Sequence, residues 1–386
     1  MTVSPDNRFN RFRQEMPITQ KWAYFDHAAV SPLPGPTAQR IRDWADQASS
    51  EGDAVWPEWE KEVQETRRTA ARLIAAQEGE IALINNTTQG INFVAEGFPW
   101  QPGDNVVTLA NEFPSNLYPW LNLQASGVEV RQVAAPEGVP DLQRIAEACD
   151  SRTRVVSVSW VGYQSGWRID VAEVARLAHE QGAYFFLDAI QGMGVFPLNV
   201  RAADVDFLAA DGHKWMLGPE GAGIFYLKRE LLDLLRPRSV GWNSVSHRYD
   251  FGRIELDLRD TAARYEGGSQ NIVGLLALGV SLKLLESAGL GPDHSEIAAR
   301  ILELTDYAVN GLQDRGAEPF SRRTADSASG IVSFRVPAAD PRQLRSRAIE
   351  AGINLSVRGD LLRMSPHAYN TWEEIDRLLE IVASAG

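Results

Sequence analysis

Apolar and polar residues along residues 36–235 fall into blocks that predict strands separated by helices. Short apolar runs such as residues 183–187 and 205–210 are typical of buried strands. Between such runs lie segments of helical length, for example residues 62–74 and 171–179. The strands expected here are residues 81–84, 106–109, 128–133, 154–161, 183–187, 205–210 and 221–227. Strands that alternate with helices predict an α/β fold with a mostly parallel sheet and helices on both faces.

The pattern of predicted helices and strands changes in the last third of the chain. Residues 236–270 are irregular and rich in arginine, glycine and aromatic residues, and residues 271–286 have the pattern of one long helix. Helices and short strands then alternate through residues 290–386, which predicts a small α+β domain. The expected division is an N-terminal arm (1–20), a large domain (21–270) and a bridging helix with a small C-terminal domain (271–386).

Composition narrows the classes of function. The 386 residues carry a formal charge of −13, which argues against nucleic acid or an anionic membrane surface as the main partner. No apolar run has the length of a membrane span, and residues 1–16 lack the apolar core of a signal peptide. Cys149 is the only cysteine, so no intrachain disulfide can form. We therefore expect a cytoplasmic protein with no membrane partner.

A lysine lies on a glycine-bounded turn between two expected core strands. The turn reads DGHKWMLGPEG from Asp211 to Gly221, and its lysine is Lys214. A lysine beside a core must lose hydration and usually finds a specific partner. Desolvation also lowers the pKa of an amine, and an amine with a pKa near neutrality can form a Schiff base with a carbonyl compound.

A carboxylate follows the apolar strand at residues 183–187. Asp188, in the run FLDAIQ, lies where open α/β sheets bind ligands, at the C-terminal end of a buried strand. Lys214 and Asp188 together match the needs of pyridoxal 5'-phosphate (PLP), whose aldehyde bonds to a lysine and whose pyridine nitrogen is kept protonated by an acidic partner. The alternative is a helix-capping aspartate and a lysine in a surface turn. The residue types alone do not decide between the two.

The runs FLDAIQ and DGHKWMLGPEGAGIFY resemble the cofactor-binding core of the class V aminotransferase superfamily. This group contains cysteine desulfurases, cysteine/cystine C–S lyases and isopenicillin-N-epimerase-like proteins. The similarity extends from FDHAAVSPLP at residues 25–34 to SPHAYNT at residues 365–371. The resemblance implies a PLP-dependent fold of type I, with a seven-stranded sheet in the large domain and no metal. It also implies a homodimer whose two chains share each active site.

Two threonines open an expected helix directly after a strand, in the run TTQG. The free N–H groups of a helix N-terminus bind anions, although threonine is also an ordinary helix cap. The resemblance implies that Thr87 and Thr88 hold the cofactor phosphate and that His213 donates to it. Asp211 stands where relatives often carry a Ser or Thr that contacts phosphate. Because a carboxylate repels phosphate, we expect Asp211 to turn away or to pair with a cation.

The segment EGGSQN at residues 266–271 resembles one that reaches across a dimer interface to the partner's phosphate. Ser269 is the hydroxyl expected to make that contact. The alternative is a helix N-cap formed together with Asn271. If the resemblance holds, the protein must form a dimer to complete its active site.

The resemblance also suggests which residues contact the cofactor ring. Phe113 stands where desulfurases carry a histidine that stacks on the ring, and an aromatic side chain can still stack there. Its alternative role is plain core packing. Gln191 matches a residue that hydrogen-bonds the phenolic oxygen of the cofactor. Either Tyr163 or Gln164 occupies the position of an asparagine near the same oxygen, and the sequence does not distinguish them.

The C-terminal run RMSPHAYNT matches a family ending whose arginine binds the substrate carboxylate. Arg363 is that arginine, and a guanidinium suits a bidentate contact. Arg358 is a second candidate for the same task, or a solvated strand end. The segment around Ala28 lies at the substrate mouth in relatives. His27 beside it is a substrate contact or a local hydrogen-bonding residue.

Two features separate the chain from cysteine desulfurases. Phe113 cannot move protons as the replaced histidine does, and the loop before Arg363 lacks the nucleophilic cysteine of desulfurases. Cys149 lies far away, in the helical pattern LQRIAEAC. We therefore predict a PLP-dependent enzyme for which a small L-amino acid is the substrate, acting through an external aldimine and removal of the Cα proton by Lys214.

The sequence leaves three alternatives for the reaction steps that follow removal of the Cα proton. Elimination of a β-thiol would give a C–S lyase without a catalytic cysteine, which the resemblance favours. Reprotonation at the cofactor would give a transaminase, and reprotonation at Cα an epimerase. A protein of a different class, a non-catalytic PLP-fold binding protein, is disfavoured because Lys214, Asp188 and Arg363 are all present.

Overall fold

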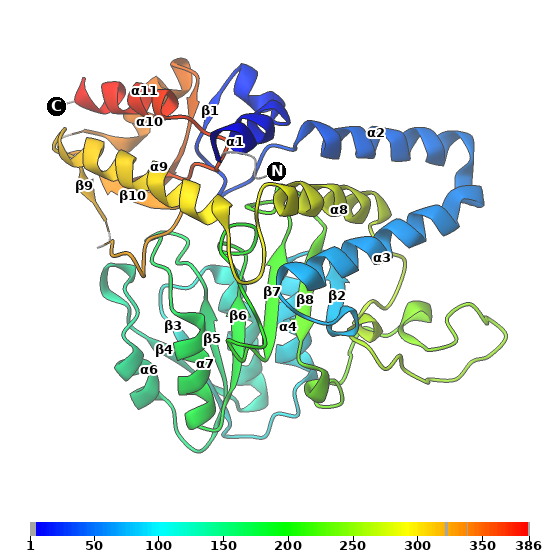
Figure 1. The fold of residues 1–386 in the computed structure, drawn as a ribbon. Helices are drawn as coiled ribbons and strands as arrows, with labels where there is room; N and C mark the ends of the chain where they lie inside the picture. Colours follow the sequence, from blue (N-terminus) through cyan, green and yellow to red (C-terminus); the bar gives the residue numbers. More distant parts are fainter. Residues whose placement is uncertain (1–4, 321–322, 338, 385–386) are drawn as a thin grey trace.

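A computed structural model describes residues 5–320, 323–337 and 339–384, and its largest sheet has seven strands (Figure 1). The strands of this sheet are β2 (Ile81–Ile84), β3 (Asn105–Leu109), β4 (Glu129–Val133), β5 (Thr153–Ser159), β6 (Tyr184–Asp188), β7 (Phe207–Asp211) and β8 (Gly223–Leu227). They lie in the order β2-β8-β7-β6-β5-β3-β4. Neighbours from β7 to β4 are parallel, whereas β8 is antiparallel to both β2 and β7. The expected α/β fold with a mostly parallel sheet is confirmed.

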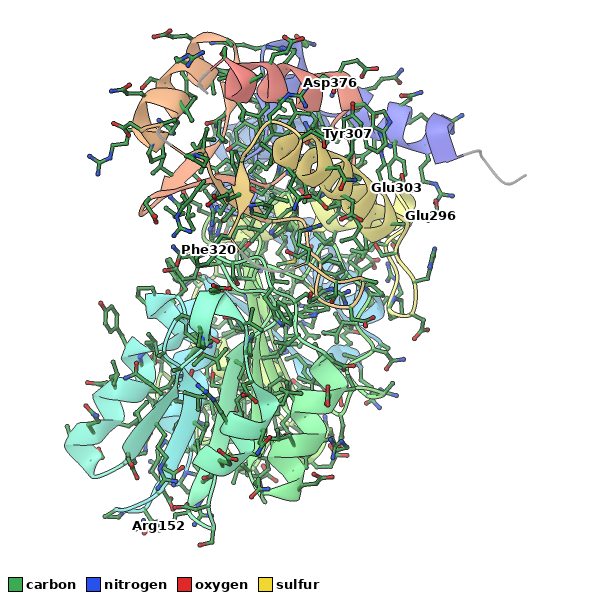
Figure 2. All side chains as sticks on the ribbon, turned by 90° about the vertical axis from the view of Figure 1, so that its left-hand side faces the viewer. Arg152, Glu296, Glu303, Tyr307, Phe320 and Asp376 are labelled. Atoms are coloured by element: carbon green, nitrogen blue, oxygen red, sulfur yellow. The ribbon has the colours of Figure 1, made fainter. Side chains whose placement is uncertain are left out.

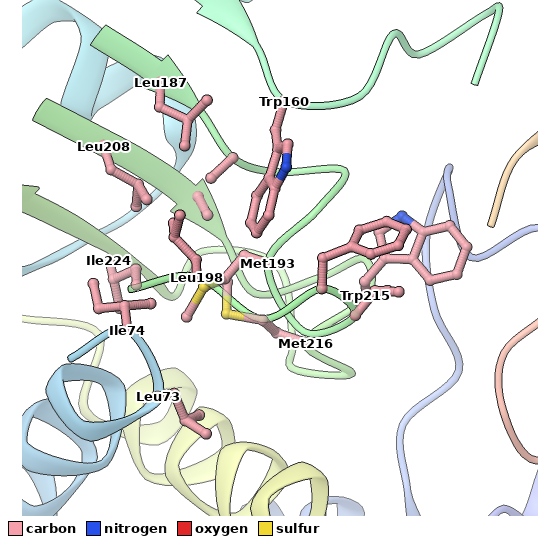
Figure 3. Packing of buried hydrophobic residues seen from close by; sticks show 14 of the residues in the cluster. Leu73, Ile74, Trp160, Leu187, Met193, Leu198, Leu208, Trp215, Met216 and Ile224 are labelled. Atoms are coloured by element: carbon pink, nitrogen blue, oxygen red, sulfur yellow. The ribbon is translucent and has the colours of Figure 1, made fainter. Parts of the chain in front are cut away.

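Helices cover both faces of this sheet, so its strands are buried on both sides. The helices of this part are α2 (Gly35–Ser50), α3 (Trp56–Leu73), α4 (Thr87–Gly97), α5 (Tyr118–Asn122), α6 (Leu142–Ala148), α7 (Val171–Glu180) and α8 (Ile272–Ser287). In β6, Phe185 and Leu187 pack into the cluster that includes α3, α7 and α8, while Phe186 packs into the cluster of α4. Figure 3 shows Leu208 and Ile224 on neighbouring strands, with Ile224 close to Ile74, the residue directly after α3. This double burial explains the continuous apolar runs in the sequence.

A smaller unit follows α8. Its helices and strands are α9 (Glu296–Gln313), β9 (Glu318–Pro319), β10 (Val332–Arg335), α10 (Pro341–Glu350), β12 (Ser356–Arg358), β13 (Leu361–Met364) and α11 (Trp372–Ala383). The strands form an antiparallel sheet in the order β12-β13-β10-β9. On the outer side α9 and α11 are joined where the Tyr307 hydroxyl donates to Asp376 at 2.6 Å (Figure 2).

The N-terminal segment lies against this smaller unit. Helix α1 (Pro5–Gln14) precedes β1 (Ala23–Tyr24), which pairs in parallel with β11 (Ile353–Asn354). Residues 1–4 of the expected arm lie outside the described residues. The pairing joins residues on both sides of the expected domain boundary near residue 270, and that division of the chain stays a prediction.

Residues 236–271 contain no long helix or strand. Ala262 and Tyr265 are buried in the core, whereas an earlier part of this segment forms an arm that projects from the body beside β2 and β8 (Figure 1, light green). Several large apolar side chains on it are exposed, namely Val240, Trp242, Tyr249, Phe251, Ile254 and Leu256. The irregular character expected for residues 236–270 is therefore confirmed. Among the helices that the structure describes, none is long and apolar enough to cross a membrane.

Candidate active site

A cavity of about 270 Å³ opens at the C-terminal ends of β6 and β7, near the lower end of the range for small-molecule sites, roughly 300–1,000 Å³. It brings together most of the side chains that the sequence singled out. The predicted site residues that line it are Ala28, Thr87, Thr88, Phe113, Asp188, Gln191, His213, Lys214, Arg358 and Arg363. His27 and Ser269 do not line it.

Lys214 lies on the turn that follows β7, and its side chain is buried. Burial is the main reason that its pKa falls to about 8, and the nearby carboxylate of Asp188 opposes the fall. The turn is held by Ser31, whose N–H donates to the carbonyl of His213 at 2.7 Å and whose hydroxyl donates to the carbonyl of Lys214. A buried amine with a lowered pKa is suited to react with a carbonyl group.

Asp188 ends β6 and is almost fully buried, which raises the pKa of its carboxyl to about 6. One oxygen, Oδ1, accepts from the N–H of Ile190 at 3.1 Å. The side chain faces the cavity that Lys214 also lines. An ionised carboxylate in such a place is stabilised by a cationic partner.

A second buried acid, Glu112, was missed in the sequence. It follows β3, and its carboxylate accepts from the N–H of Ser159 at 2.8 Å and from the hydroxyl of the same serine. Ser159 is the register partner of Asp188 between β5 and β6. Burial is the main cause that raises the pKa of Glu112 to about 7, and the charge of Asp188 adds to it. A strand-end acid was the available signal, but the order β3-β5-β6 is needed to place it beside Asp188.

Helix α4 begins at Thr87 and points its N-terminus at the cavity. Asn86 caps it by accepting from the N–H of Gln89 at 2.9 Å, while the other first N–H groups have no intrahelical acceptor. Gly90 lets the helix approach β7, because a Cβ there would lie 2.6 Å from that of Ala209. The position is suited to an anion, as expected for Thr87 and Thr88.

Asp211, the last residue of β7, does not turn away from the cavity. Its Oδ1 accepts from the N–H of Gly212 at 2.7 Å, and its Oδ2 lies 2.9 Å from Nδ1 of His213. The N–H of Asp211 donates to the hydroxyl oxygen of Thr87 at 3.0 Å. The imidazole of His213 is therefore the side-chain partner of this carboxylate.

Aromatic and amide side chains form a further part of the wall. Phe113 is 43% exposed, so its alternative role as plain core is wrong. Its ring meets that of Tyr163 edge-on at 5.4 Å, and Nζ of Lys214 lies 5.5 Å from its centre. Tyr163 lines the cavity and Gln164 does not. Gln191 donates to the carbonyl of Ala28 at 3.0 Å and retains a second amide N–H.

Two arginines reach the cavity from the hairpin of β12 and β13. Arg363 is 1% exposed, and burial lowers its pKa to about 10. Its guanidinium donates to the carbonyl of Tyr163 at 2.8 Å and to Asp26 at 3.2 Å, while its buried Nε has no partner among the described residues. Arg358 donates to the carbonyl of its neighbour Val357 at 3.1 Å. Two guanidiniums in one small cavity favour an anionic ligand group.

His27 does not fulfil the expectation of a substrate contact. Its ring is fully buried, with Nε2 2.7 Å from the hydroxyl of Tyr369 and Nδ1 2.9 Å from the carbonyl of Ser365. Burial lowers its pKa to about 4, so the ring is neutral. The alternative of a local hydrogen-bonding residue describes it, because both ring nitrogens are occupied within the protein. Ala28 beside it does line the cavity.

Ser269 and Cys149 lie apart from the cavity of their own chain. Ser269 is exposed, and Asn271 rather than Ser269 caps α8 by accepting from the N–H of Gly274 at 3.2 Å. The alternative of a capping role for Ser269 is therefore not realised. Cys149 follows α6, and its thiol donates to the carbonyl of Ile145 at 3.2 Å. Burial raises the pKa of this thiol to about 11.

The chain is similar to known proteins over nearly its whole length. The sequence matches the family model described as aminotransferase class V over residues 23–378. A probable cysteine desulfurase of Methanothermobacter thermautotrophicus is 32% identical over 402 residues, covering 97% of this chain and 98% of that protein. The apo structure of a cysteine desulfurase from Thermococcus onnurineus has a TM-score of 0.87 at 26% identity, covering 100% of this chain and 98% of that one. The cystine C–S lyase C-DES, solved with its product cysteine persulfide, shares the fold with a TM-score of 0.89 at 22% identity and covers 96% and 100%.

Proposed function

The chain belongs to the class V aminotransferase family, and from this membership we propose that it is a PLP-dependent enzyme acting on a small L-amino acid. One observation carries the proposal. A single small cavity holds Lys214 with a lowered pKa, a buried carboxylate at Asp188 and a buried guanidinium at Arg363. These three side chains come from distant parts of the sequence and have the chemistry that the cofactor and an amino-acid substrate need.

The residues present fit the cofactor. Asp188 is a buried carboxylate with one N–H donor, so a protonated ring nitrogen would supply the cation that it lacks. Lys214 would hold the aldehyde carbon, and the N-terminus of α4 with Thr87 and Thr88 would hold the phosphate. Phe113 presents an exposed ring at the cavity, where it would lie against the pyridine ring.

The cofactor, when bound, supplies an electron sink for the pair of electrons left by the Cα proton. Arg363 would bind the substrate carboxylate through its free Nε edge, since its other edge already contacts Asp26 and Tyr163. Lys214, with a pKa lowered to about 8, is neutral in about a tenth of the molecules near pH 7 and would accept the Cα proton on Nζ. The rings of Tyr163 and Phe113 meet edge-on at the wall of this cavity.

We assign the chemistry after deprotonation to elimination at a carbon–sulfur bond without a catalytic cysteine. The Cβ–S bond would break with both electrons leaving on sulfur, and the remaining three-carbon unit would hydrolyse to pyruvate and ammonia. Similarity to proteins named cysteine desulfurase supports a sulfur-containing amino acid. The hairpin before Arg363 supports the absence of a persulfide-forming loop, because Arg358 and Leu361 pair directly across the two-residue turn Gly359–Asp360.

The test is an incubation of the purified protein with cysteine, cystine and a panel of other amino acids, with and without a keto acid. Repeated turnover to pyruvate, ammonia and a sulfur product without keto acid supports the lyase. One turnover per site that resumes only with keto acid would identify a transaminase. Loss of optical purity without new products would identify an epimerase, and no change with any amino acid would contradict enzymatic function.

A homodimer with a shared active site is part of the proposal. Ser269 is exposed and does not line the cavity of its own chain. The exposed apolar side chains of the projecting arm are what a subunit interface covers. We therefore propose that Ser269 donates to the phosphate in the partner subunit's cavity. A cytoplasmic location stays a prediction from the sequence.

A further inference from the structure

The hairpin of β12 and β13 places two guanidinium groups on one of its faces. In the register of the two strands, Ser356 lies opposite Arg363, and Arg358 lies opposite Leu361. Arg358 and Arg363 are therefore diagonal neighbours on the same face, a relationship that separates two residues by about 7–8 Å. Both side chains line the cavity at the ends of β6 and β7. One arginine is enough to bind the carboxylate of an amino acid, so the second is available for a different group.

Arg363 already has a carboxylate partner within the chain. Its guanidinium lies 3.2 Å from Asp26, and its free Nε edge is the proposed contact for the α-carboxylate of the substrate. Burial is the main cause that lowers the pKa of Arg363 to about 10, and the charge of Arg358 adds to it. The two cations are therefore close enough to repel each other, and an anion bound beside Arg358 would relieve that repulsion.

Arg358 has no carboxylate partner among the residues that the structure describes. The hydrogen bond that its guanidinium donates goes to the carbonyl of the neighbouring Val357, at 3.1 Å. The nearest acid in the sequence, Asp360, accepts instead from Nε of Arg335 at 2.7 Å. Arg358 therefore brings to the cavity a positive charge that no described carboxylate pairs with.

Apolar side chains line other parts of the same cavity. Val30 and Phe113 are 44% and 43% exposed, so a bound substrate can reach them, and Ile190 lines the cavity as well. Apolar walls suit the carbon and sulfur atoms of a thioether side chain. A side chain that lies along them and ends in an anionic group could pair with the free guanidinium of Arg358.

We propose, as an extension of the proposed function, that Arg358 binds a second acid group at the end of the substrate side chain. The substrate class is then a sulfur-containing L-amino acid whose sulfur substituent ends in a carboxylate. Arg363 binds the α-carboxylate and Arg358 binds the distal one, so the two arginines select both the length and the charge of the substrate. A free β-thiol, as in cysteine, leaves Arg358 unpaired.

The test uses S-carboxymethyl-L-cysteine and S-carbamoylmethyl-L-cysteine, which have nearly the same shape but end in a carboxylate and in a neutral amide. Holoenzyme is mixed with each, and the change in cofactor absorbance on binding and kcat/KM for pyruvate formation are measured. We expect the wild type to prefer the acid by about 10- to 100-fold. Arg358→Gln should lose this preference by weakening the acid alone. Arg358→Lys should keep part of it, since the charge remains without the fork.

Arg342→Gln is the matched control, because it removes one positive charge from an exposed position on α10. It should keep the wild-type preference, and thermal unfolding should show that each variant folds. Equal use of the two thioethers by the wild type would overturn the inference. Equal losses for both in Arg358→Gln would also overturn it and would place Arg358 on the α-carboxylate. Both results would leave the proposed function standing, whereas a holoenzyme whose absorbance no amino acid changes would end both proposals.

Discussion

The guanidinium of Arg363 lies 3.2 Å from Oδ1 of Asp26, although 337 positions separate the two residues. Asp26 forms a bridge to Ser365 beside the strand that carries Arg363, so the N-terminal segment supplies the carboxylate that orients the arginine. Both side chains are largely buried. A guanidinium held on one edge has its remaining edge preorganised for a second carboxylate.

Arg363→Lys should strongly weaken substrate binding. A lysine cannot contact Asp26 and Tyr163 and still present a fork, so we expect a cost of about 2–5 kcal/mol. That cost corresponds to a fall in kcat/KM of roughly 30-fold or more, measured with the best substrate of the panel. Arg358→Ala is the comparison. Near-normal efficiency of Arg363→Lys together with a large loss in Arg358→Ala would show that the carboxylate binds to Arg358.

Lys214 should carry the cofactor. Purified protein should be yellow, and reduction with borohydride followed by peptide mapping should find the cofactor on the peptide that contains Lys214. Lys214→Ala should be colourless after dialysis, because no other amine lines the cavity within the described residues. Lys61→Ala, which changes an exposed lysine, should remain yellow. Labelling of any other lysine would show the assignment to be wrong.

Glu112 should make the stability of the apo-protein depend on pH. Its pKa is raised from 4.5 to about 7, so the folded state keeps a proton that the unfolded state loses first. The stabilisation is complete below pH 4.5 and is lost as the pH rises through 7. Glu112→Gln is neutral throughout, and Gln can still accept from the N–H of Ser159. Relative to wild type, it should therefore gain about 2–3 kcal/mol of unfolding free energy between about pH 5 and pH 8.

Denaturant unfolding at the two pH values measures this difference. Glu350→Gln, at an exposed position on α10, should show no such change with pH. A difference between Glu112→Gln and wild type that stays constant with pH would show that Glu112 ionises alike in the folded and unfolded states.

Cys149→Ser should retain activity within a few-fold. The thiol has a pKa raised to about 11 by burial and is outside the cavity, so almost none of it is the reactive thiolate at neutral pH. Intact-mass measurement after incubation with cysteine should find no sulfur atom added to the chain. A persulfide on Cys149, or a loss of activity beyond about 10-fold in the serine variant, would overturn the proposed cysteine-free route.

Two inactive variants should restore each other if the active site is shared. Lys214→Ala removes the cofactor lysine, and Ser269→Asp places a negative charge against the phosphate in the partner subunit's cavity. In a mixed dimer, one cavity combines an intact Lys214 with an intact Ser269 of the partner subunit. Random mixing should therefore make about one site in four active. If Ser269 served its own chain, mixing would restore nothing.

The main sheet could be predicted from hydrophobic pattern because its strands are buried on both faces. The run at residues 81–84 coincides with β2, and the runs ending at residues 187 and 210 differ from the ends of β6 and β7 by one residue. The short strands β1 and β9 were not predicted, since two residues carry no periodicity. The hydrophobic pattern did not predict the order of the strands in the sheet either, because strand pairing depends on contacts between segments that are distant in the sequence.

Sequence motifs also predicted most residues of the candidate site, because these residues lie close to the buried strands. Lys214, Asp188 and Thr87 lie at strand ends or on turns directly attached to strands, where local sequence determines the position. Topology then brings these ends together at one edge of the sheet. The sequence alone therefore determined an α/β protein with a strand-end lysine, carboxylate and helix N-terminus.

Only the tertiary structure decided which side chains face the cavity and which partners they have. Glu112 contacts Ser159 because β5 lies between β3 and β6, and His27 turns to Ser365 and Tyr369 because β1 pairs with β11. The carboxylate of Asp211 lies beside the imidazole of His213 on the turn after β7, and Ser31, which is distant in the sequence, hydrogen-bonds to that turn. The periodicity of a sequence reports which face of an element is buried, whereas these contacts depend on how elements far apart in the chain pack together in space.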